Sequence, residues 1–242
     1  MRYRLGSVPY LNAEPLLDGL EASLRVEPSR LMRSLLAGEV DVGVLSVGAA
    51  LLHGLRILPS CGVASDGPVG SVFLLHEAPF CEVRRVRPDP ASVTSNLLAR
   101  ILVERTGSGT WKEVEQQEEG RVLIGDAALA LEDWKGTDLG KAWKDWTGLP
   151  FVFAAWVVGP QVPDAGLEEL DMELAAAAER GMSFQGRARC VREQRVVAPE
   201  AAHAYLAGLR HRLDLRFREG MDRYAVEAAR LGIGAGEVRW AC

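Results

Sequence analysis

Cysteine and histidine are both scarce in this chain, which contains four of each among 242 residues. The cysteines are widely separated, with no Cys-x-x-Cys pair and no histidine at the spacing of a metal ligand; they are Cys61, Cys81, Cys190 and Cys242. This pattern excludes a zinc ribbon and a disulfide framework, so we expect four free thiols. Since no metal-ligand cluster and no phosphate-binding loop motif is present, we expect no metal and no other cofactor.

A long hydrophobic run and an excess of positive charge are also missing. The longest apolar run, Phe151–Val158, has the length of a strand, whereas a membrane span needs about 20 residues. The chain has 28 Lys and Arg against 33 Asp and Glu, a net charge of −5, which excludes a general nucleic-acid binder. The segment Met1–Val8 lacks the apolar run of a signal peptide. We therefore expect a cytoplasmic protein with no membrane or nucleic-acid partner and a local anion site; the oligomeric state stays open.

The chain does contain an alternation of strand and helix patterns, in a length that suits one large α/β domain or two lobes of about 100 residues each. A strand is predicted over Arg2–Val8, a helix between Ser29 and Gly38, and a buried strand over Val40–Leu45, which is a βαβ unit. Further helices are predicted over Pro15–Gly19, Val47–Leu52, Leu97–Gly107, Leu167–Arg180, Ala201–Leu213 and Phe217–Leu231, and further strands over Leu24–Val26, Arg56–Leu58, Ser71–His76, Val83–Arg87 and Val122–Gly125.

The run Phe151–Val158 is apolar on both faces, which is typical of a central strand. We expect the chain to leave one lobe and return to it, with Val72–Leu75 and Val152–Val157 as the crossings. The first lobe then comprises residues 1–76 and 158–242, and the second comprises residues 77–157. In such a two-lobed α/β fold a ligand binds in the cleft between the lobes, where strand ends and helix N-termini converge.

Glycines and small hydroxyl residues gather where predicted strands or helices begin or end. The longest such stretch, residues 62–72, has the sequence GVASDGPVGSV, which allows a small anion to approach the backbone closely. Segments of similar chemistry are Val8–Asn12, Leu45–Ser46, Ser92–Ser95 and Gly125–Ala128. Together they predict one site built from loops.

Five blocks in order carry a family resemblance: VPYLNAEPL at 8–16, GPVGSV at 67–72, SVTS at 92–95, LIGDAAL at 123–129 and TGLPFVFAAW at 147–156. Together they resemble the chorismate dehydratase family, and the resemblance continues to the helical region around Tyr205 and Leu213. It implies a type II periplasmic-binding-protein-like fold. It also implies an enzyme of the futalosine route to menaquinone that converts chorismate into 3-(1-carboxyvinyloxy)benzoate with loss of water, a hydro-lyase.

Other functions fit parts of the same pattern. The later-acting 1,4-dihydroxy-6-naphthoate synthase of that route has the same fold, but its family carries an Asn-Asp-Thr segment near the first strand, where this chain has Leu11-Asn12-Ala13. A non-catalytic binding protein for a small carboxylate would have the same cleft, although the missing signal peptide argues against it. A ligand-sensing regulator would need a further domain, for which the chain has no spare length.

Asn12 and Ser71 are the candidate catalytic residues. The uncharged Asn12 amide can donate to the leaving hydroxyl or position the ring; the alternative is an Asn that caps the helix at Pro15. Ser71 follows a Gly-Pro-Val-Gly approach and can donate to a carboxylate or move a proton, whereas the alternative is packing at a strand edge beside a glycine bulge.

Hydroxyl groups and helix starts supply the candidate substrate-binding residues, because they can hold a dicarboxylate without a full cation. For the serines and Thr94 the alternative is plain helix capping, which is also the main alternative for Asp126. For the tryptophan it is a place in the core. The candidates are Tyr10, Ser46, Gly70, Ser92, Thr94, Ser95, Asp126 and Trp156.

No obvious protein base is left for the proton. The histidines fall outside the blocks and receive no catalytic role; they are His53, His76, His203 and His211. Asp126 and Glu14 are the remaining protein candidates. The third possibility is that the enolpyruvyl carboxylate of the substrate itself takes the proton.

Overall fold

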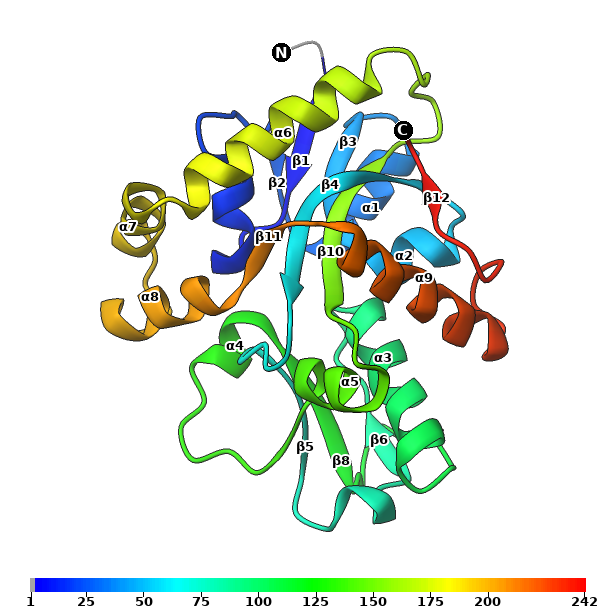
Figure 1. Cartoon of the computed structure of the whole chain (residues 1–242). Coiled ribbons are helices and arrows are strands. Elements are labelled where there is room, and N and C mark those ends of the chain that lie inside the picture. The colour runs from blue at the N-terminus through cyan, green and yellow to red at the C-terminus, as the bar shows by residue number, and fades with distance from the viewer. Residues whose placement is uncertain (1–2) are drawn as a thin grey trace.

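The computed structural model describes residues 3–242 and arranges them around two β-sheets, one above the other in Figure 1. The larger sheet has the order β11-β4-β10-β3-β1-β2, with β12 paired to β4, and the smaller has the order β7-β6-β8-β5-β9. The larger sheet contains β1 (Leu5–Ser7), β2 (Leu24–Arg25), β3 (Val42–Ser46), β4 (Arg56–Ser65), β10 (Phe151–Val158), β11 (Arg210–Arg212) and β12 (Arg239–Trp240). The smaller contains β5 (Val72–His76), β6 (Arg85–Arg87), β7 (Lys112–Glu113), β8 (Gly120–Ile124) and β9 (Gly136–Asp138).

Helices cover both sheets (Figure 1). Two are 3-10 helices, η1 (Leu11–Leu17) and η2 (Phe80–Glu82). The α-helices are α1 (Pro28–Leu36), α2 (Val47–Leu52), α3 (Val93–Thr106), α4 (Gly125–Leu129), α5 (Leu139–Thr147), α6 (Leu167–Met182), α7 (Phe184–Glu193), α8 (Pro199–Gly208) and α9 (Leu215–Arg230). None of the helices in residues 3–242 has the length and apolar character needed to cross a membrane.

The predicted βαβ unit is confirmed as β1, α1 and β3, with the two strands parallel. α1 begins at Pro28, whose missing N–H suits a first helical position, and it buries Leu31 and Leu35. Gly6 in β1 makes room for this helix, since a Cβ there would lie 2.4 Å from Leu31 Cδ1. Because β1 and β3 run parallel, the segments that follow them, η1 and α2, begin at the same edge of the sheet.

β10 is the central strand that its apolar sequence predicts. It pairs antiparallel with both β3 and β4, and α2 and α9 pack against it. Its predicted role as a crossing is wrong, because all of Phe151–Val158 lies in the larger sheet. The other predicted crossing is wrong too, since β5 belongs to the smaller sheet, where it pairs with β8 and β9. The burial of β10 reflects the neighbouring strands on its two edges and the helices packed against it, not a position between lobes.

Strand pairing therefore divides the chain differently from the predicted boundaries at residues 76 and 158. We call residues 3–65 and 151–242 the first lobe, because they build the larger sheet, and residues 72–138 the second lobe, because they build the smaller one. The chain passes between the lobes before β5 and again through α5 and the turn that follows it.

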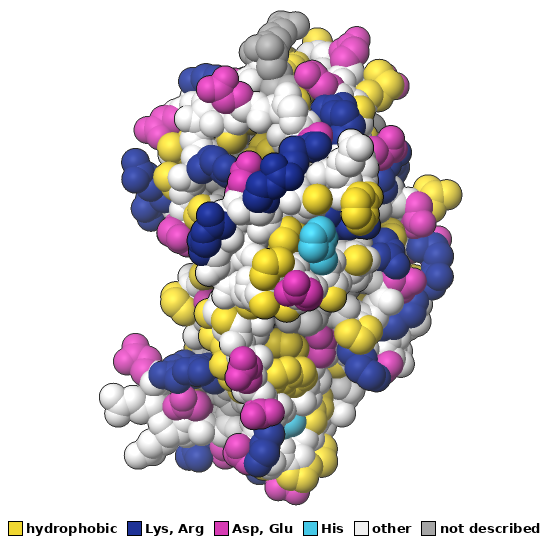
Figure 2. Space-filling view, turned by 90° about the vertical axis from the view of Figure 1, so that its left-hand side faces the viewer, with side chains coloured by type: hydrophobic (Ala, Val, Ile, Leu, Met, Phe, Trp, Pro, Cys, Tyr) yellow, Lys and Arg dark blue, Asp and Glu magenta, His cyan; other side chains and the backbone are white. Residues whose placement is uncertain are grey.

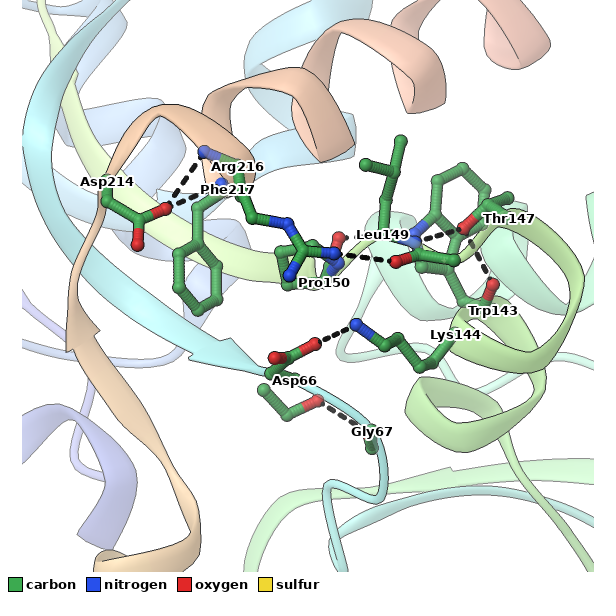
Figure 3. Close-up of polar contacts among 12 residues, drawn as sticks. Asp66, Gly67, Trp143, Lys144, Thr147, Leu149, Pro150, Asp214, Arg216 and Phe217 are labelled. Atoms are coloured by element: carbon green, nitrogen blue, oxygen red, sulfur yellow. Dashed lines mark hydrogen bonds and ion pairs between the residues drawn. The ribbon is translucent and has the colours of Figure 1, made fainter.

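These two connections lie side by side (Figure 3). Lys144 in α5 forms an ion pair with Asp66, which directly follows β4. Arg216 in α9 donates to the backbone carbonyl of Gly148 at 2.9 Å, just beyond the end of α5. The return connection is thereby attached to both the outgoing connection and the first lobe.

The C-terminal region differs in part from its prediction. α6 and α9 occupy the predicted helical segments, but the single helix predicted over Ala201–Leu213 is wrong. α8 ends at Gly208, and β11 follows and pairs antiparallel with β4. Within β11 only His211 is buried, between two exposed arginines, so the strand is too short for its alternation to show in the sequence. α7 also has no counterpart in the prediction.

Candidate functional site

A cavity lies between the lobes, where the segments after β1 and β3 meet the start of α3. Its empty volume, with the open solvent at its mouth included, is about 580 Å³. On the face that carries α7 and α8, hydrophobic side chains gather at mid-height between two more highly charged ends (Figure 2). The apolar lining includes Val44, Val63, Ile124 and Phe153; the polar side chains in the lining are Tyr10, Asn12, Ser46, Ser92 and Ser95.

Ser92 and Ser95 form the first turn of α3. The Ser92 hydroxyl accepts the backbone N–H of Ser95 at 3.1 Å and donates to the Ser95 hydroxyl at 3.0 Å. Both residues line the cavity. The first N–H groups of a helix carry partial positive charge, which favours an anion in front of them. Capping by Ser92 is therefore confirmed, and it leaves the helix start facing the cavity.

Ser46 and Thr94 connect α2 with α3. Ser46 lines the cavity and caps α2, because its hydroxyl accepts the Ala49 N–H at 3.4 Å. Thr94 is fully buried outside the lining, where its hydroxyl accepts the Gly48 N–H at 2.8 Å. Successive residues of a helix point about 100° apart, so Thr94 and Ser95 face different sides. The structure thus places Thr94 in the packing between two helices, not at the cavity surface where the sequence predicts it.

Asn12 lines the cavity and is held by two residues from the C-terminal part of the chain. Its Nδ2 donates to the Tyr205 hydroxyl at 3.2 Å, and His211 Nε2 donates to its backbone carbonyl at 2.7 Å. The Tyr205 hydroxyl also lies 2.8 Å from the hydroxyl of Ser71, which is buried outside the lining. Ser71 is therefore connected to Asn12 through Tyr205. The Asn12 side chain makes no capping bond to η1, whose N-cap is Tyr10.

Both of these supporting side chains are neutral near pH 7. Burial raises the pKa of Tyr205 to about 12, against the smaller opposing effects of its bonds to Ser71 and Asn12. Burial lowers the pKa of His211 to about 4, although its bond to the Asn12 carbonyl acts in the opposite direction. The site around Asn12 consequently contains neutral hydrogen-bonding groups.

The loop before β5 is fixed by a carboxylate. Asp138 Oδ2 accepts the backbone N–H groups of Val69 at 3.0 Å and Gly70 at 2.8 Å, and Asp138 also caps α5. Gly70 has a φ of +72°, in the left-handed region that favours glycine. Gly70, predicted to bind substrate, thus lies outside the lining, shapes the turn before Ser71 and has its N–H engaged by Asp138.

Tyr10 follows β1 and lines the cavity. Its hydroxyl donates to Glu27 Oε2 at 2.7 Å. Burial first, and then this bond, raise the pKa of Tyr10. Because its O–H is engaged by Glu27, Tyr10 offers a ligand mainly the surface of its ring.

The two carboxylates considered as bases, Asp126 and Glu14, lie outside the lining. Burial raises the pKa of Asp126, partly offset by the backbone N–H of Leu11. Burial also raises the pKa of Glu14, partly offset by its ion pair with Arg25. The alternative of Asp126 as a helix cap is wrong, since no side chain caps α4.

Trp156 lies in the core, which is the alternative to its predicted role in substrate binding. It is fully buried and outside the lining, and Phe153 of the same strand lines the cavity instead. Two irregularities in the pairing of β10 with β4, between Val152 and Ala154 and again further along, disturb the simple alternation of side chains. The side of the sheet to which Trp156 points therefore cannot be predicted from the regular alternation of side chains along a strand.

The structure brings five of the predicted residues to one cavity surface and places the other five around it. Those outside the lining are Gly70, Ser71, Thr94, Asp126 and Trp156. Four residues that hold the site together are not among the predicted site residues: Tyr205, His211, Glu27 and Asp138. Asp138 had a usable signal as an acidic N-cap before α5, whereas nothing in the sequence connects Tyr205 or His211 with Asn12, from which they are 193 and 199 residues away.

Known structures share this architecture. Protein AF1704 from Archaeoglobus fulgidus superposes with a TM-score of 0.72 at 17% identity, covering 95% of this chain and 97% of its own. The alkanesulfonate-binding protein SsuA from Xanthomonas axonopodis pv. citri, bound to MOPS, superposes with a TM-score of 0.63 at 13% identity, covering 98% and 95%. The two-lobed α/β architecture with its interlobe cavity is thus a periplasmic-binding-protein-like fold.

A family narrower than the fold is also established. The family model described as "Menaquinone biosynthesis" matches residues 3–230, and the chain belongs to this family. A chorismate dehydratase from Thermus thermophilus is 31% identical over 262 aligned residues, which cover 92% of this chain and 94% of that protein. A chorismate dehydratase from Campylobacter jejuni is 30% identical over 151 residues, covering 60% and 58%.

Proposed function

We propose that this protein is a chorismate dehydratase, a lyase that converts chorismate into 3-(1-carboxyvinyloxy)benzoate and water in the futalosine route to menaquinone. The observation that carries the proposal is the interlobe cavity, which gathers uncharged hydrogen-bonding groups from segments of both lobes. Membership of the menaquinone biosynthesis family and the two chorismate dehydratase relatives support the choice of substrate.

The reaction removes a ring hydroxyl and an adjacent proton from a cyclohexadiene. The product ring is aromatic, so the substrate itself supplies the thermodynamic driving force. The protein has to orient the ring, assist the departure of hydroxide or water, and provide a path for one proton. Asn12 suits the second task, because its amide can donate to the leaving hydroxyl without introducing a charge.

The carboxylates of chorismate need donors fixed in advance. In this proposal Ser92, Ser95 and the first N–H groups of α3 hold one carboxylate, and Ser46, which also lines the cavity, contacts the ligand from the first lobe. Tyr10 and Phe153 provide aromatic walls. One preorganised donor of this kind contributes about 3 kcal/mol to transition-state stabilisation, so a few are enough for a substantial acceleration.

The proton is proposed to go to the enolpyruvyl carboxylate of chorismate itself. Among the described residues that line the cavity there is no Asp, Glu, Lys, Arg or His. Asp126 and Glu14 lie outside the lining. An intramolecular base is already held close to the ring, which satisfies the geometric requirement of proton transfer.

A non-catalytic carboxylate-binding protein is the second candidate. It is favoured by the fold shared with SsuA, the alkanesulfonate-binding protein whose structure contains bound MOPS. The two candidate functions are distinguished by the fate of bound chorismate, because an enzyme converts it and a binding protein leaves it unchanged.

A cytoplasmic location is part of the proposal. All four cysteines are free, which is typical of a reducing compartment. Cell fractionation with an antibody to the chain tests this location, and recovery with the periplasmic or extracellular fraction would contradict it.

The function is tested by incubating the purified protein with chorismate, without added metal, and following ultraviolet spectra and the masses of the products. We expect an aromatic product lighter than chorismate by one water. Calorimetry on the same sample measures binding. Tight binding with unchanged chorismate would establish the binding protein instead, and neither binding nor turnover would reject both candidates.

A further inference from the structure

The side-chain amide of Asn12 has a defined partner behind the cavity. Tyr205 lies on α8 with 8% of its surface exposed, and its hydroxyl has two neighbours, Asn12 Nδ2 at 3.2 Å and Ser71 Oγ at 2.8 Å. Since Asn12 Nδ2 can only donate, the Tyr205 oxygen accepts from it. The buried O–H of Tyr205 is then satisfied by donating to Ser71. One hydrogen-bond chain thus runs from Asn12 through Tyr205 to Ser71.

The main chain of Asn12 is fixed from the same side. The His211 ring donates from Nε2 to the Asn12 carbonyl at 2.7 Å, which requires the proton on that nitrogen. His211 is 2% exposed and lies in β11, which pairs with β4 on either side of it. Its position is therefore set by the larger sheet. The segment Tyr205–His211 holds both the side chain and the backbone of one cavity residue.

We propose that Tyr205 and His211 are positioning residues that preset the rotamer and backbone of Asn12 for its contact with the substrate ring, an inference that rests on the proposed function. With one Nδ2 proton engaged by Tyr205, the second Nδ2 proton and Oδ1 of Asn12 remain for the substrate. A donor fixed in this way loses no orientational freedom when the transition state forms. A free Asn12 side chain would populate several rotamers.

The chain also joins the two lobes. Asn12 and Tyr205 belong to the first lobe, whereas Ser71 directly precedes β5 of the second. Gly70 shapes the turn that leads to this contact, because its φ of +72° lies in the left-handed region that favours glycine. The orientation of the Asn12 side chain is consequently coupled to the position of the second lobe, because the hydrogen-bond chain forms only when Ser71 lies within reach of Tyr205.

The test compares Tyr205→Phe with Tyr224→Phe. Tyr224 is a matched control because it is also buried, at 1% exposure, and its hydroxyl donates to the Thr94 carbonyl at 3.1 Å on the side of α3 away from the cavity. We expect Tyr205→Phe to lower kcat for chorismate by about 10- to 100-fold with KM changed less than about threefold. Tyr224→Phe is expected to keep kcat within about twofold while losing a similar amount of melting temperature.

His211 is tested by conservative rescue. His211→Gln keeps an N–H donor that can reach the Asn12 carbonyl, whereas His211→Leu removes it. We expect kcat to fall in the leucine variant and to recover at least in part in the glutamine variant, at similar KM. Equal kcat in the two variants would overturn the role of His211, and equal kcat in Tyr205→Phe and Tyr224→Phe would overturn the role of Tyr205.

A spectroscopic readout separates this inference from the proposed function. The side-chain amide signals of Asn12 are identified in a ¹⁵N-correlated NMR spectrum as those lost in Asn12→Ala. We expect them to shift in Tyr205→Phe and to stay in place in Tyr224→Phe. If the wild-type protein leaves chorismate unchanged, the proposed function fails, and these signals still decide whether Tyr205 holds Asn12: an unshifted pair in Tyr205→Phe overturns the inference.

Discussion

Replacing Thr94 with valine removes one hydroxyl while keeping the shape of the side chain. In the structure that hydroxyl accepts the Gly48 N–H at 2.8 Å, in a region where Thr94 is fully buried. Water has little access to the orphaned N–H, because a Cβ on Gly48 would already lie 2.9 Å from Thr94 Cα. A buried donor left without a partner costs about 1–3 kcal/mol. For a protein of this size, a loss of about 2 kcal/mol in unfolding free energy lowers the melting temperature by about 4–8 °C, which is the change that we expect.

The assay is thermal and urea unfolding of Thr94→Val beside Thr106→Val. Thr106 is a control in the same helix, and its hydroxyl donates to the Leu102 carbonyl at 2.8 Å. That carbonyl also accepts the Gly107 N–H, so the control leaves no buried group unpaired and should change stability by less than about 0.5 kcal/mol. KM for chorismate should stay near the wild-type value in both variants. A large rise in KM for Thr94→Val at unchanged stability would contradict this reasoning and restore Thr94 as a substrate contact.

Three further outcomes follow from particular contacts. Gly62→Ala places a Cβ 2.4 Å from the Ala154 carbonyl oxygen, so we expect urea unfolding to show a stability loss of about 1–3 kcal/mol. Gly208→Ala, which has open space at its Cβ, should be nearly neutral, and equal effects of the two substitutions would contradict the close pairing of β4 with β10. Ser92→Ala removes the cap of α3 and a cavity hydroxyl, so it should lower stability by about 1 kcal/mol and raise KM, and an unchanged KM would exclude Ser92 from the substrate site. Folding lowers the pKa of His211 from 6.5 to about 4, so the unfolded chain binds more protons than the folded chain between these pH values. The contribution to stability is therefore full above pH 6.5 and should fall by about 3 kcal/mol toward pH 4. His211→Gln should flatten this pH dependence of the unfolding free energy, whereas the control His53→Gln, at an exposed site, should keep it.

Much of the fold could be predicted because the relevant signals are local. The βαβ unit follows from an apolar stripe on α1 between two buried strands, and β10 follows from eight consecutive apolar residues. Strands such as β7, β9, β11 and β12 have only two or three residues, which is too short for a period to be visible. Their pairing is decided by the rest of the sheet.

The parts of the site that could be predicted are short segments whose polar residues lie at the end of a strand or the start of a helix. Asn12, Ser46 and Ser92 sit where strands end and helices begin, and in this fold the positions from the two sheets meet at the cavity between the lobes. Which neighbour in the same segment faces the cavity depends on helix phase and strand register, as Thr94 and Trp156 show. Long-range partners are set by tertiary packing alone, which is why no sequence signal indicates the bond from Asn12 to Tyr205.

In the proposed function, the interlobe cavity around Asn12 binds chorismate and removes water from it. The most direct measurement is the mass spectrum of chorismate after incubation with wild-type protein and with Asn12→Ala, each at a concentration shown by calorimetry to bind the ligand. We expect complete conversion to a product lighter by one water with the wild type, and bound but essentially unconverted chorismate with the variant. Conversion by Asn12→Ala at the wild-type rate would contradict it.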